Sequence, residues 1–496
     1  MMRFLLAAVL YLNFAGAQSH TPAQFDAKKI DAAADAAMRA WNAPGVAVAI
    51  VRDDRVVLLK GYGVKERGGN NAVTPRTVFA IGSTTKAFTT AAIAMLIDDG
   101  KMSWDDPVRK HIEFFRLSDP LASEQVTLRD LTSHRTGLSR NDNLWYGSPW
   151  SQEEIIRRIG YVKLSRPFRT TYQYQNIMFS AAGFAVGKAS GGTWQDFVQR
   201  RILDPLGMTD TSFTTSVAER APDHASPHAK GRGGELGVVP WRNLDNIAPA
   251  GSINSSAEDL AKWVRLQLND GTFERKRLIS ERNLREMHTP QMAMRPDDWG
   301  RSWNPETIQS SYGLGWTIHD YRGLHLVSHG GAIDGFRANI TLVPREKLGI
   351  VVLTNLGSDN MPEALRWSIL DVLHGFPARD WNATLIAHFG AEQQAARAAA
   401  QERQLKRAPN TKPSLELTKY AGVYHDTAYG DVRILVESGA LALEWANVRS
   451  PLEHFHYDTF QVKDGRLDNA PVVFHLNASG AVSGITFQDV DFRRAR

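Results

Sequence analysis

The stretch FAIGSTTKAFTT, residues 79–90, has an apolar run and a glycine directly before Ser83 and Lys86. Residues three positions apart on a helix share one face, about 5 to 6 Å apart at Cβ, so the Lys86 amine can reach the Ser83 hydroxyl. A serine at a helix start also lies in a positive field that favours its alkoxide. The apolar flanks predict that Lys86 lies near the core. The stretch therefore predicts a serine nucleophile with a lysine beside it, and the alternative is a chance pair with a solvated lysine.

The segments around this stretch predict an α+β domain. Residues 91–100 continue the apolar run as a buried helix that ends at Gly100, and an N-terminal helix is predicted to end near residues 43–45. GVAVAIVRDDRVVLLKGYGV, residues 45–64, has the pattern of a β-hairpin. Helices and loops follow to about residue 310. Three strand-like segments then come before a last helix near residue 375. We expect one antiparallel sheet, completed from both ends of the domain and flanked by helices, with a large helical subdomain inserted.

The remainder of the chain divides into a connector and a second domain. GAEQQAARAAAQERQLKRA, residues 390–408, is rich in Ala, Gln and Arg without an apolar face, and PNTKPS follows it. This pattern predicts a helical connector that ends in an extended linker. Short alternating strands with Gly, Asp and Asn turns then predict a small all-β barrel or sandwich. The predicted segments are a signal peptide (1–17), the α+β domain (18–375), the connector and linker (376–414) and the β domain (415–496).

The first residues have the features of a secretory signal. MMRFLLAAVLYLNFAGAQ carries Arg3, an apolar run and the small residues Ala15, Gly16 and Ala17. A membrane anchor is the alternative, but the apolar run is shorter than the roughly 20 residues that a spanning helix needs. The sequence contains no cysteine, which excludes disulfides and thiol nucleophiles and suits a bacterial periplasm or exterior. We expect a periplasmic or secreted protein that has no membrane contact after cleavage.

Composition and charge exclude other function classes. The chain has 496 residues, 43% of them apolar and 22% charged, with a net charge of +5. Globular proteins have this balance. Basic residues are scattered, without the basic stripe and interleaved aromatic residues that a nucleic-acid partner requires. His224 and His228, like His454 and His456, lack the spacing of a metal site. We expect no nucleic-acid partner and no metal.

A second motif is Tyr174-Gln175-Asn176. A buried ammonium beside a phenol lowers the pKa of the phenol, because the opposite charge favours the phenolate. Such a tyrosine can take the serine proton and pass it to a leaving group. Asn176 can hydrogen-bond both a lysine and a substrate amide. Tyr-x-Asn also occurs by chance at Tyr11-Leu12-Asn13, so the motif is not specific alone.

A third motif, SHGGAIDG, begins at Ser328. Glycines in a strand allow another backbone or a ligand to approach closely, so Gly330 and Gly331 are predicted substrate contacts beside His329. If this strand faces Ser83, the amide N–H groups of Ala332 and Ser83 form an oxyanion hole. The alternative is a hairpin turn with an incidental histidine.

In this order, the three motifs resemble the signature of serine β-lactamases and penicillin-binding proteins. The form with tyrosine and histidine is similar to the group of class C β-lactamases, D-aminopeptidases and esterases. The resemblance covers roughly residues 25 to 375 and extends to four further segments: LTSHRTGL, DPLGMTDTSF, APAGSINSSAEDLAKW and YGLGW. The C-terminal strands resemble a lipocalin-like domain that is appended to some members.

The resemblance implies an acyl-enzyme mechanism without a metal or cofactor. Ser83 would attack a carbonyl, Lys86 and Tyr174 would act as the coupled base, and water activated by Tyr174 would release the acyl group. Asn176 and His329 complete the implied catalytic set.

The third motif departs from the Lys-Thr-Gly of the family. His329 is expected to be neutral at pH 7 and Gly330 has no side chain, so neither provides a fixed charge for a substrate carboxylate. The sequence therefore favours a hydrolase of peptide or amide bonds in small or short linear peptides. The alternatives are an esterase, a β-lactamase, or a penicillin-binding module that does not turn over. A homo-oligomer is left open.

Overall fold

The computed structural model describes residues 25–231, 234–295, 304–357, 360–463 and 465–495. The predicted signal peptide, residues 1–17, lies outside the described residues. Within them, the first domain contains an eight-stranded sheet in the order β2-β1-β14-β13-β12-β11-β10-β9. Its strands are β1 (Gly45–Arg52), β2 (Arg55–Gly63), β9 (Met292–Ala293), β10 (Ser310–Tyr312), β11 (Thr317–Tyr321), β12 (Leu324–Ile333), β13 (Phe336–Val343) and β14 (Leu348–Thr354).

The two ends of the domain meet within this sheet, as its second and third strands from one edge. β1 pairs antiparallel with β14, with Val46 opposite Thr354 and Ile50 opposite Ile350. Val46, Val48 and Ile50 face one core, and the intervening residues face the other, which is the two-residue period of a strand buried on both faces. This pairing confirms the predicted α+β fold with one antiparallel sheet.

The number of strands after residue 310 was predicted incorrectly. The segment from Leu324 to Val343 forms two strands, β12 and β13, and β10 and β11 precede them. Short strand pairs also interrupt the helical region: β3 (Phe79–Ala80) with β6 (Asn254–Ser255), β4 (His228–Lys230) with β5 (Leu236–Val238), and β7 (Thr272–Phe273) with β8 (Lys276–Arg277). β12 and β13 are joined through Asp334 and Gly335, and two residues are enough for a tight hairpin.

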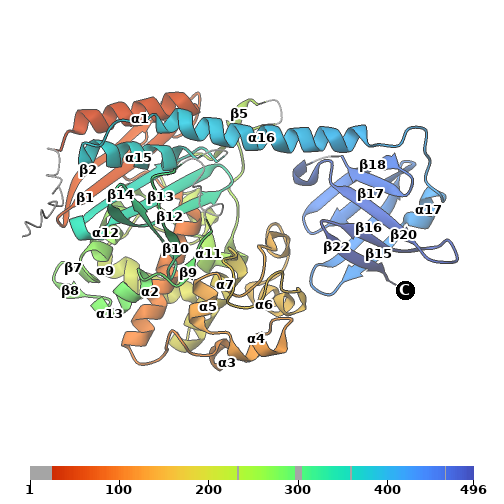
Figure 1. Cartoon of the computed structure of the whole chain (residues 1–496), viewed down its shortest axis with the longest axis horizontal. Helices are drawn as coiled ribbons and strands as arrows, with labels where there is room; N and C mark the ends of the chain where they lie inside the picture. Colours follow the sequence, from red (N-terminus) through yellow and green to blue (C-terminus); the bar gives the residue numbers. More distant parts are fainter. Residues whose placement is uncertain (1–24, 232–233, 296–303, 358–359, 464, 496) are drawn as a thin grey trace, which may run out of the picture.

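Helices cover both faces of the sheet (Figure 1). α1 (Ala27–Trp41) and α15 (Met361–His374) pack on one face, and the helical region that contains α2 (Thr85–Asp98), α7 (Asn176–Ser190) and α12 (Ala257–Leu268) packs on the other. The remaining α-helices of this region are short: α3 (Val108–His111), α4 (Pro120–Gln125), α5 (Leu128–Thr132), α6 (Gln152–Arg158), α8 (Trp194–Val198), α9 (Asp204–Leu206), α10 (Thr215–Ala218), α11 (Ala248–Gly251) and α13 (Glu281–Met287).

α16 (Trp381–Leu405) runs from this domain to a closed barrel (Figure 1). The barrel has its own apolar core, which includes Tyr424, Leu443 and Phe487. It is preceded by α17 (Leu417–Tyr420) and consists of β15 (Gly422–Asp426), β16 (Gly430–Glu437), β17 (Ala440–Trp445), β18 (Val448–His456), β19 (Thr459–Val462), β20 (Pro471–Leu476), β21 (Val482–Phe487) and β22 (Val490–Arg494). The barrel confirms the predicted all-β C-terminal domain.

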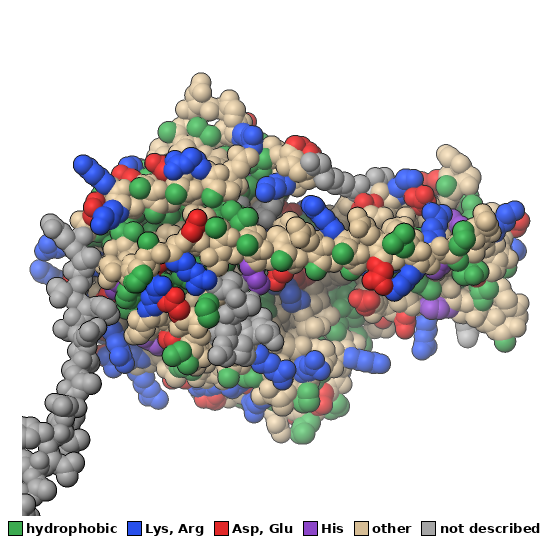
Figure 2. Space-filling view, turned by 45° about the horizontal axis from the view of Figure 1, so that its top comes forward, with side chains coloured by type: hydrophobic (Ala, Val, Ile, Leu, Met, Phe, Trp, Pro, Cys, Tyr) green, Lys and Arg blue, Asp and Glu red, His purple; other side chains and the backbone are tan. Residues whose placement is uncertain are grey.

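The surface carries charges of both signs. On the face drawn in Figure 2, basic and acidic side chains are interspersed over α16 and both domains. Among the described residues, no helix combines the length and the apolar character that crossing a membrane requires.

Candidate active site

Ser83 lies in a single 3-10 turn, Gly82–Thr84, that leads directly into α2. The turn is positioned by its neighbours on both sides: β3 precedes it and pairs with β6, and Ile81 donates its amide N–H to the Ile253 carbonyl at 3.0 Å. Ser83 is partly exposed, whereas Thr84, Thr85 and Lys86 are buried. The fold thus exposes only the first side chain of the Ser-x-x-Lys motif.

Lys86 is fully buried and its amine has three polar neighbours. Its Nζ lies 3.1 Å from Ser83 Oγ, 2.8 Å from Asn176 Oδ1 and 2.8 Å from the Ala250 carbonyl oxygen. None of these three neighbours of the Lys86 amine is a carboxylate. Burial lowers the pKa of Lys86 well below its ordinary value, and the nearby positive charge of Arg140 lowers it further.

A neutral Lys86 amine matches this set of neighbours. An uncharged amine has two N–H donors and one lone pair. The donors are satisfied by Asn176 Oδ1 and the Ala250 carbonyl, which leaves the lone pair directed to Ser83 Oγ. Lys86 is therefore arranged to accept the Ser83 proton.

Tyr174 lies beside both groups, but its pKa is shifted opposite to the prediction. Its hydroxyl is hydrogen-bonded with the Ser83 side chain, and Lys86 Nζ lies 4.8 Å from the centre of its ring. Burial raises the pKa of Tyr174 above its ordinary value and outweighs the hydrogen bond with Ser83. The predicted lowering required a charged ammonium, and burial disfavours the charged form of Lys86. Tyr174 is thus a protonated phenol that can donate its proton.

Asn176, the first residue of α7, connects Lys86 to the loop at residues 140–145. Its Oδ1 accepts from Lys86 Nζ, and its Nδ2 donates to Asp142 Oδ1 at 3.2 Å. Asp142 Oδ1 also accepts from Trp145 Nε1 at 2.8 Å. Arg140, whose guanidinium lies 5.2 Å from the centre of the Tyr174 ring, forms an ion pair with Asp142. This loop therefore brings a charge pair to the rim of the site.

His329 is buried and its two ring nitrogens already have partners. Nδ1 lies 2.6 Å from the Gly330 carbonyl and Nε2 lies 2.8 Å from the Tyr312 hydroxyl. Burial lowers the pKa of His329 to about 3, so Nδ1–H donates and Nε2 accepts. The ring is neutral at pH 7. The structure orients His329 toward Tyr312, a residue that the sequence analysis included only within the segment YGLGW.

Two glycines bring strand β12 against the 3-10 turn Gly82–Thr84, which carries Ser83 and is called the nucleophile turn below. A Cβ at Gly82, where φ is +51°, would lie 2.7 Å from the Ala332 nitrogen, and a Cβ at Gly331 would lie 1.9 Å from the Ile81 carbonyl oxygen. Neither position has room for a side chain. The Ala332 amide is thereby held against the turn that carries Ser83, as an oxyanion hole requires.

The two predicted substrate glycines lie on different faces of β12. Gly331 is buried against the nucleophile turn, whereas Gly330 is exposed and lines a cavity on the other side of the sheet. Adjacent residues of a strand point to opposite faces. Gly331 therefore serves close packing, and Gly330 is available to a ligand.

Sequence reasoning assigned no role to several residues of the site, among them Arg140, Asp142, Ala250 and His134. The Ala250 carbonyl, from α11, contacts Lys86; the residue lies in the segment APAGSINSSAEDLAKW, but a backbone acceptor has no sequence signature of its own. His134 is buried with φ at +58°. It holds the Tyr174 segment on both sides: its carbonyl accepts from Gln173 N–H at 2.8 Å and its Nδ1 accepts from Gln175 N–H at 3.0 Å. The signal available for His134 in the sequence was its position in LTSHRTGL, one of the segments that carry the family resemblance.

No group of three or more metal-ligating side chains occurs among the described residues. The site described above consists of a hydroxyl, an amine, a phenol and amide groups. These groups can perform nucleophilic acyl transfer, with Ser83 as nucleophile and Lys86 as base.

Comparisons with known proteins identify the family of the chain. The family described as Beta-lactamase matches residues 30–374, and a Domain of unknown function (DUF3471) matches residues 406–496. Unguisins hydrolase ungD of Aspergillus violaceofuscus is 30% identical over 436 residues, which cover 81% of this chain and 75% of that protein. Protein flp of Staphylococcus aureus is 26% identical over 349 residues, which cover 68% of this chain and 64% of that protein.

Solved structures share the fold. The octameric penicillin-binding protein homologue from Pyrococcus abyssi superposes with a TM-score of 0.62 at 23% identity, covering 94% of this chain and 100% of that chain. A D-stereospecific amidohydrolase from Streptomyces sp. has a TM-score of 0.55 at 22% identity, covering 70% of this chain and 98% of that chain. The family match spans most of the first domain and a hydrolase relative at 30% identity covers 81% of the chain, so this chain belongs to the beta-lactamase family of serine hydrolases.

Proposed function

We propose that this protein is an exported serine amidohydrolase that cleaves peptide bonds in small or linear peptides through an acyl-enzyme. The observation that carries the proposal is the contact of Ser83 Oγ with the buried Lys86 amine at 3.1 Å. Export rests on the sequence features of residues 1–17.

Acylation follows from the geometry of the site. The Ser83 hydroxyl transfers its proton to the neutral Lys86 amine as its oxygen attacks the substrate carbonyl carbon. The carbonyl oxygen takes the negative charge between the N–H groups of Ser83 and Ala332, and removing one such donor typically costs 10²- to 10³-fold in rate. Tyr174, a protonated phenol beside Ser83, donates its proton to the leaving nitrogen as the C–N bond breaks. Lys86 then returns the proton it took to Tyr174.

Deacylation uses the same groups in reverse. A water molecule replaces the leaving amine and gives its proton to the Lys86 and Tyr174 pair, and its oxygen attacks the acyl carbon. The C–O bond to Ser83 then breaks and Ser83 recovers its proton. No group outside this set of residues is required by the proton balance.

The environment of His329 supports linear amides rather than penicillin-like substrates. Family members with Lys-Thr-Gly hold a substrate carboxylate with a fixed charge and a hydroxyl. Here the ring of His329 is neutral and hydrogen-bonded to Tyr312, and Gly330 has no side chain. The name of the relative at 30% identity, Unguisins hydrolase, also supports hydrolysis as the reaction.

The test is a hydrolysis panel with purified protein: nitroanilides of D and L amino acids, short peptides, short-chain esters and a cephalosporin. We expect turnover of peptides or nitroanilides. Ser83→Ala and Lys86→Ala should each lower kcat by at least about 10²-fold, the lower end of what general base catalysis contributes. Lys406→Ala, which removes an exposed lysine of the connector region, is the matched control and should leave kcat unchanged.

The panel also separates the alternatives. Turnover of esters alone would replace the amidase assignment by an esterase. Rapid turnover of the cephalosporin would assign a β-lactamase. A label that stays on Ser83 for hours, without product, would assign a penicillin-binding module.

A further inference from the structure

One end of the barrel lies against a segment of the first domain that we call the rim loop, residues 141–150. Consecutive barrel strands pair antiparallel, so every second turn lies at the same end of the barrel. The turns at one end all meet the rim loop. The contacts join Tyr429 to Asn141, Asn447 to Gly147, and both Arg466 and Gln488 to Asn143. The barrel is therefore placed to add side chains to this loop.

The rim loop borders the active site at two points. Asp142 Oδ1 accepts from Nδ2 of Asn176, whose Oδ1 contacts the catalytic amine. Further along the loop, the Tyr146 hydroxyl donates to the Asp334 carboxylate. Asp334 lies two residues beyond Ala332, which carries the oxyanion amide, and two residues along a strand span about 7 Å. The rim loop thus lies close to the position of a bound substrate.

Two guanidinium groups lie over the ring of Tyr146. The centre of the ring is 4.4 Å from Cζ of Arg242 and 4.9 Å from Cζ of Arg466. Arg242 forms an ion pair with Asp334 at 2.9 Å. Arg466 lies in a 3-10 turn of the barrel, Gly465–Leu467, and donates from Nη1 to Asn143 Oδ1 at 3.3 Å. Within the described part of the chain Arg466 forms no ion pair.

The charge of Arg466 is incompletely compensated. Desolvation by the surrounding protein lowers the pKa of Arg466 from its ordinary value, and the positive charge of Arg242 acts in the same direction. Tyr146, Asp334 and Asp142 act in the opposite direction without outweighing these two effects. Because an arginine side chain stays protonated in proteins, an anion that binds beside Arg466 would be stabilised.

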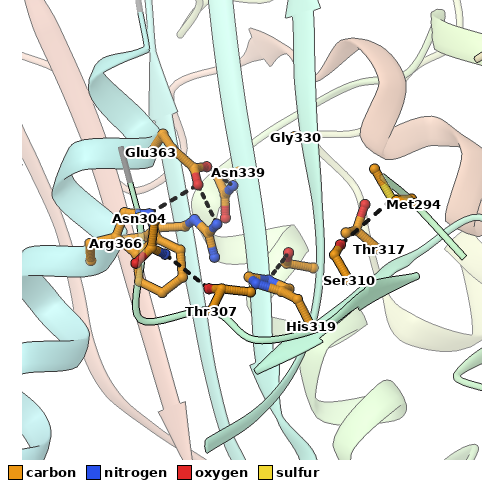
Figure 3. A pocket seen from close by; sticks show the side chains of 12 residues that line it. Met294, Asn304, Thr307, Ser310, Thr317, His319, Gly330, Asn339, Glu363 and Arg366 are labelled. Atoms are coloured by element: carbon orange, nitrogen blue, oxygen red, sulfur yellow. Dashed lines mark hydrogen bonds and ion pairs between the residues drawn. The ribbon is translucent and has the colours of Figure 1, made fainter. Parts of the chain in front are cut away.

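Arg466 differs in this respect from the arginine in the cavity behind β12 (Figure 3). Arg366 is 4% exposed there and forms an ion pair with Glu363. Arg466 is exposed. An arginine carries five N–H donors in a planar fork that matches a carboxylate, and the bond to Asn143 uses one of them. A carboxylate can therefore reach Arg466 and find free donors.

The rim loop and the His329 motif lie on opposite sides of the oxyanion amide. His329 and Gly330 precede Ala332 in β12, whereas Asp334 follows it. A group bound beside Asp334 is thus distinct from the carboxylate that Lys-Thr-Gly holds in other family members.

We propose that Arg466 is a specificity residue contributed by the barrel, and that it binds a carboxylate of the substrate at the rim of the active site. The guanidinium donates N–H hydrogen bonds to the carboxylate oxygens, as in other pairs of arginine and carboxylate. The proposal deepens the proposed function and rests on it.

Two sets of peptides test the preference. In the first set, Glu or Gln stands at each position in turn of a short alanine peptide that is blocked at both ends. In the second set, the chain ends in a free carboxylate or in an amide. In at least one pair we expect kcat/KM of the acidic peptide to exceed that of the neutral one by about fivefold, the upper range for an exposed ion pair. The set that shows the preference identifies the carboxylate as a side chain or a chain end.

Arg466→Gln should bring this ratio to about one. The ratio is independent of the fraction of enzyme that is folded, because both peptides meet the same preparation. A residue that only holds the barrel in place would affect acidic and neutral peptides equally. Arg466→Lys keeps the positive charge and should retain a preference for the acidic peptide.

Arg433→Gln is the matched control, because it removes an exposed arginine of the barrel strand β16. It should leave the ratio unchanged. A wild-type enzyme that cleaves the acidic and neutral members of every pair equally, or an Arg466→Gln ratio equal to that of wild type, would overturn the subsite while leaving the proposed function intact.

A binding measurement keeps the subsite testable without turnover. Calorimetric titration of Ser83→Ala protein with the same peptide pairs should give a lower Kd for the acidic member of at least one pair. Adding Arg466→Gln should remove the difference. Equal Kd values in every pair would reject the subsite. The expected difference in Kd, together with a wild-type enzyme that cleaves no peptide or nitroanilide, would reject the proposed function alone.

Discussion

At the scale of single residues, burial determines which group is the base and which is the acid. Lys86 and Tyr174 lie in the same buried site, and burial moves their pKa values apart because it disfavours each charged form. Burial thus favours the neutral amine and the protonated phenol. These are the two protonation states that acylation needs.

This arrangement predicts the pH dependence of kcat/KM. Activity requires neutral Lys86, so it rises with pH through the pKa of Lys86, which lies well below 10.5. It requires protonated Tyr174, whose raised pKa lies above 10.0, so activity falls only in strongly alkaline solution. A pH profile of kcat/KM should therefore show an acid limb well below the ordinary pKa of a lysine and an alkaline limb above pH 10.

Arg140 provides the test of this assignment. Its charge is the second cause of the lowered pKa of Lys86, after burial. Arg140→Gln should therefore raise the pKa of Lys86 and move the acid limb to higher pH. Any shift of the alkaline limb to higher pH should be no larger than the shift of the acid limb. Arg397→Gln, at an exposed position of α16, should leave the profile in place. An acid limb that stays fixed in Arg140→Gln would contradict Lys86 as the titrating base.

At the scale of elements, the site depends on the close approach of β12 to the nucleophile turn. We predict that Gly331→Ala loses activity and stability together, because its Cβ would lie 1.9 Å from the Ile81 carbonyl oxygen and backbone must move. Overpacking of this kind costs about 1 to 3 kcal/mol of unfolding free energy. A displaced Ala332 amide should lower kcat by about 10²- to 10³-fold. Denaturant unfolding and ester or peptide kinetics measure both effects.

Gly237→Ala in β5 is the matched control, since a Cβ there meets no heavy atom within 4 Å. It should change neither kcat nor the unfolding midpoint measurably. A Gly331→Ala enzyme with wild-type kcat would show that the approach of β12 does not position the oxyanion amide.

The same strand shows how far sequence reasoning reached. The glycines of SHGGAIDG predicted a close approach, and Gly331 makes one. The segment was not divided into two strands, because β13 is buried on both faces and lacks the alternation that marks a half-buried strand. The two faces of β12 could not be assigned either, since the choice depends on which helices cover each face. The Ala250 carbonyl and the pKa of Tyr174 depend on tertiary burial and have no local pattern.

At the scale of the whole molecule, the barrel contacts the loop that supports Lys86. Tyr429 packs against the cores of both domains, and its hydroxyl donates to Asn141 Oδ1 at 2.8 Å. The adjacent Asp142 accepts from Asn176, which accepts from Lys86. Two hydrogen bonds and one peptide link therefore connect this barrel contact to the Lys86 amine.

This connection predicts that a barrel residue affects catalysis. Tyr429→Phe removes the bond to Asn141 and keeps the apolar ring. A single hydrogen bond contributes about 0.5 to 1.5 kcal/mol, so we expect kcat/KM to fall by about 2- to 10-fold with little change in Tm. Tyr457→Phe, at a barrel tyrosine that is 59% exposed, is the matched control and should have wild-type kinetics. If the two variants have equal kinetics, the barrel stabilises the chain without acting on the loop at Asn141. If kcat/KM falls only in Tyr429→Phe, the second domain is part of the machinery that holds Lys86 in position.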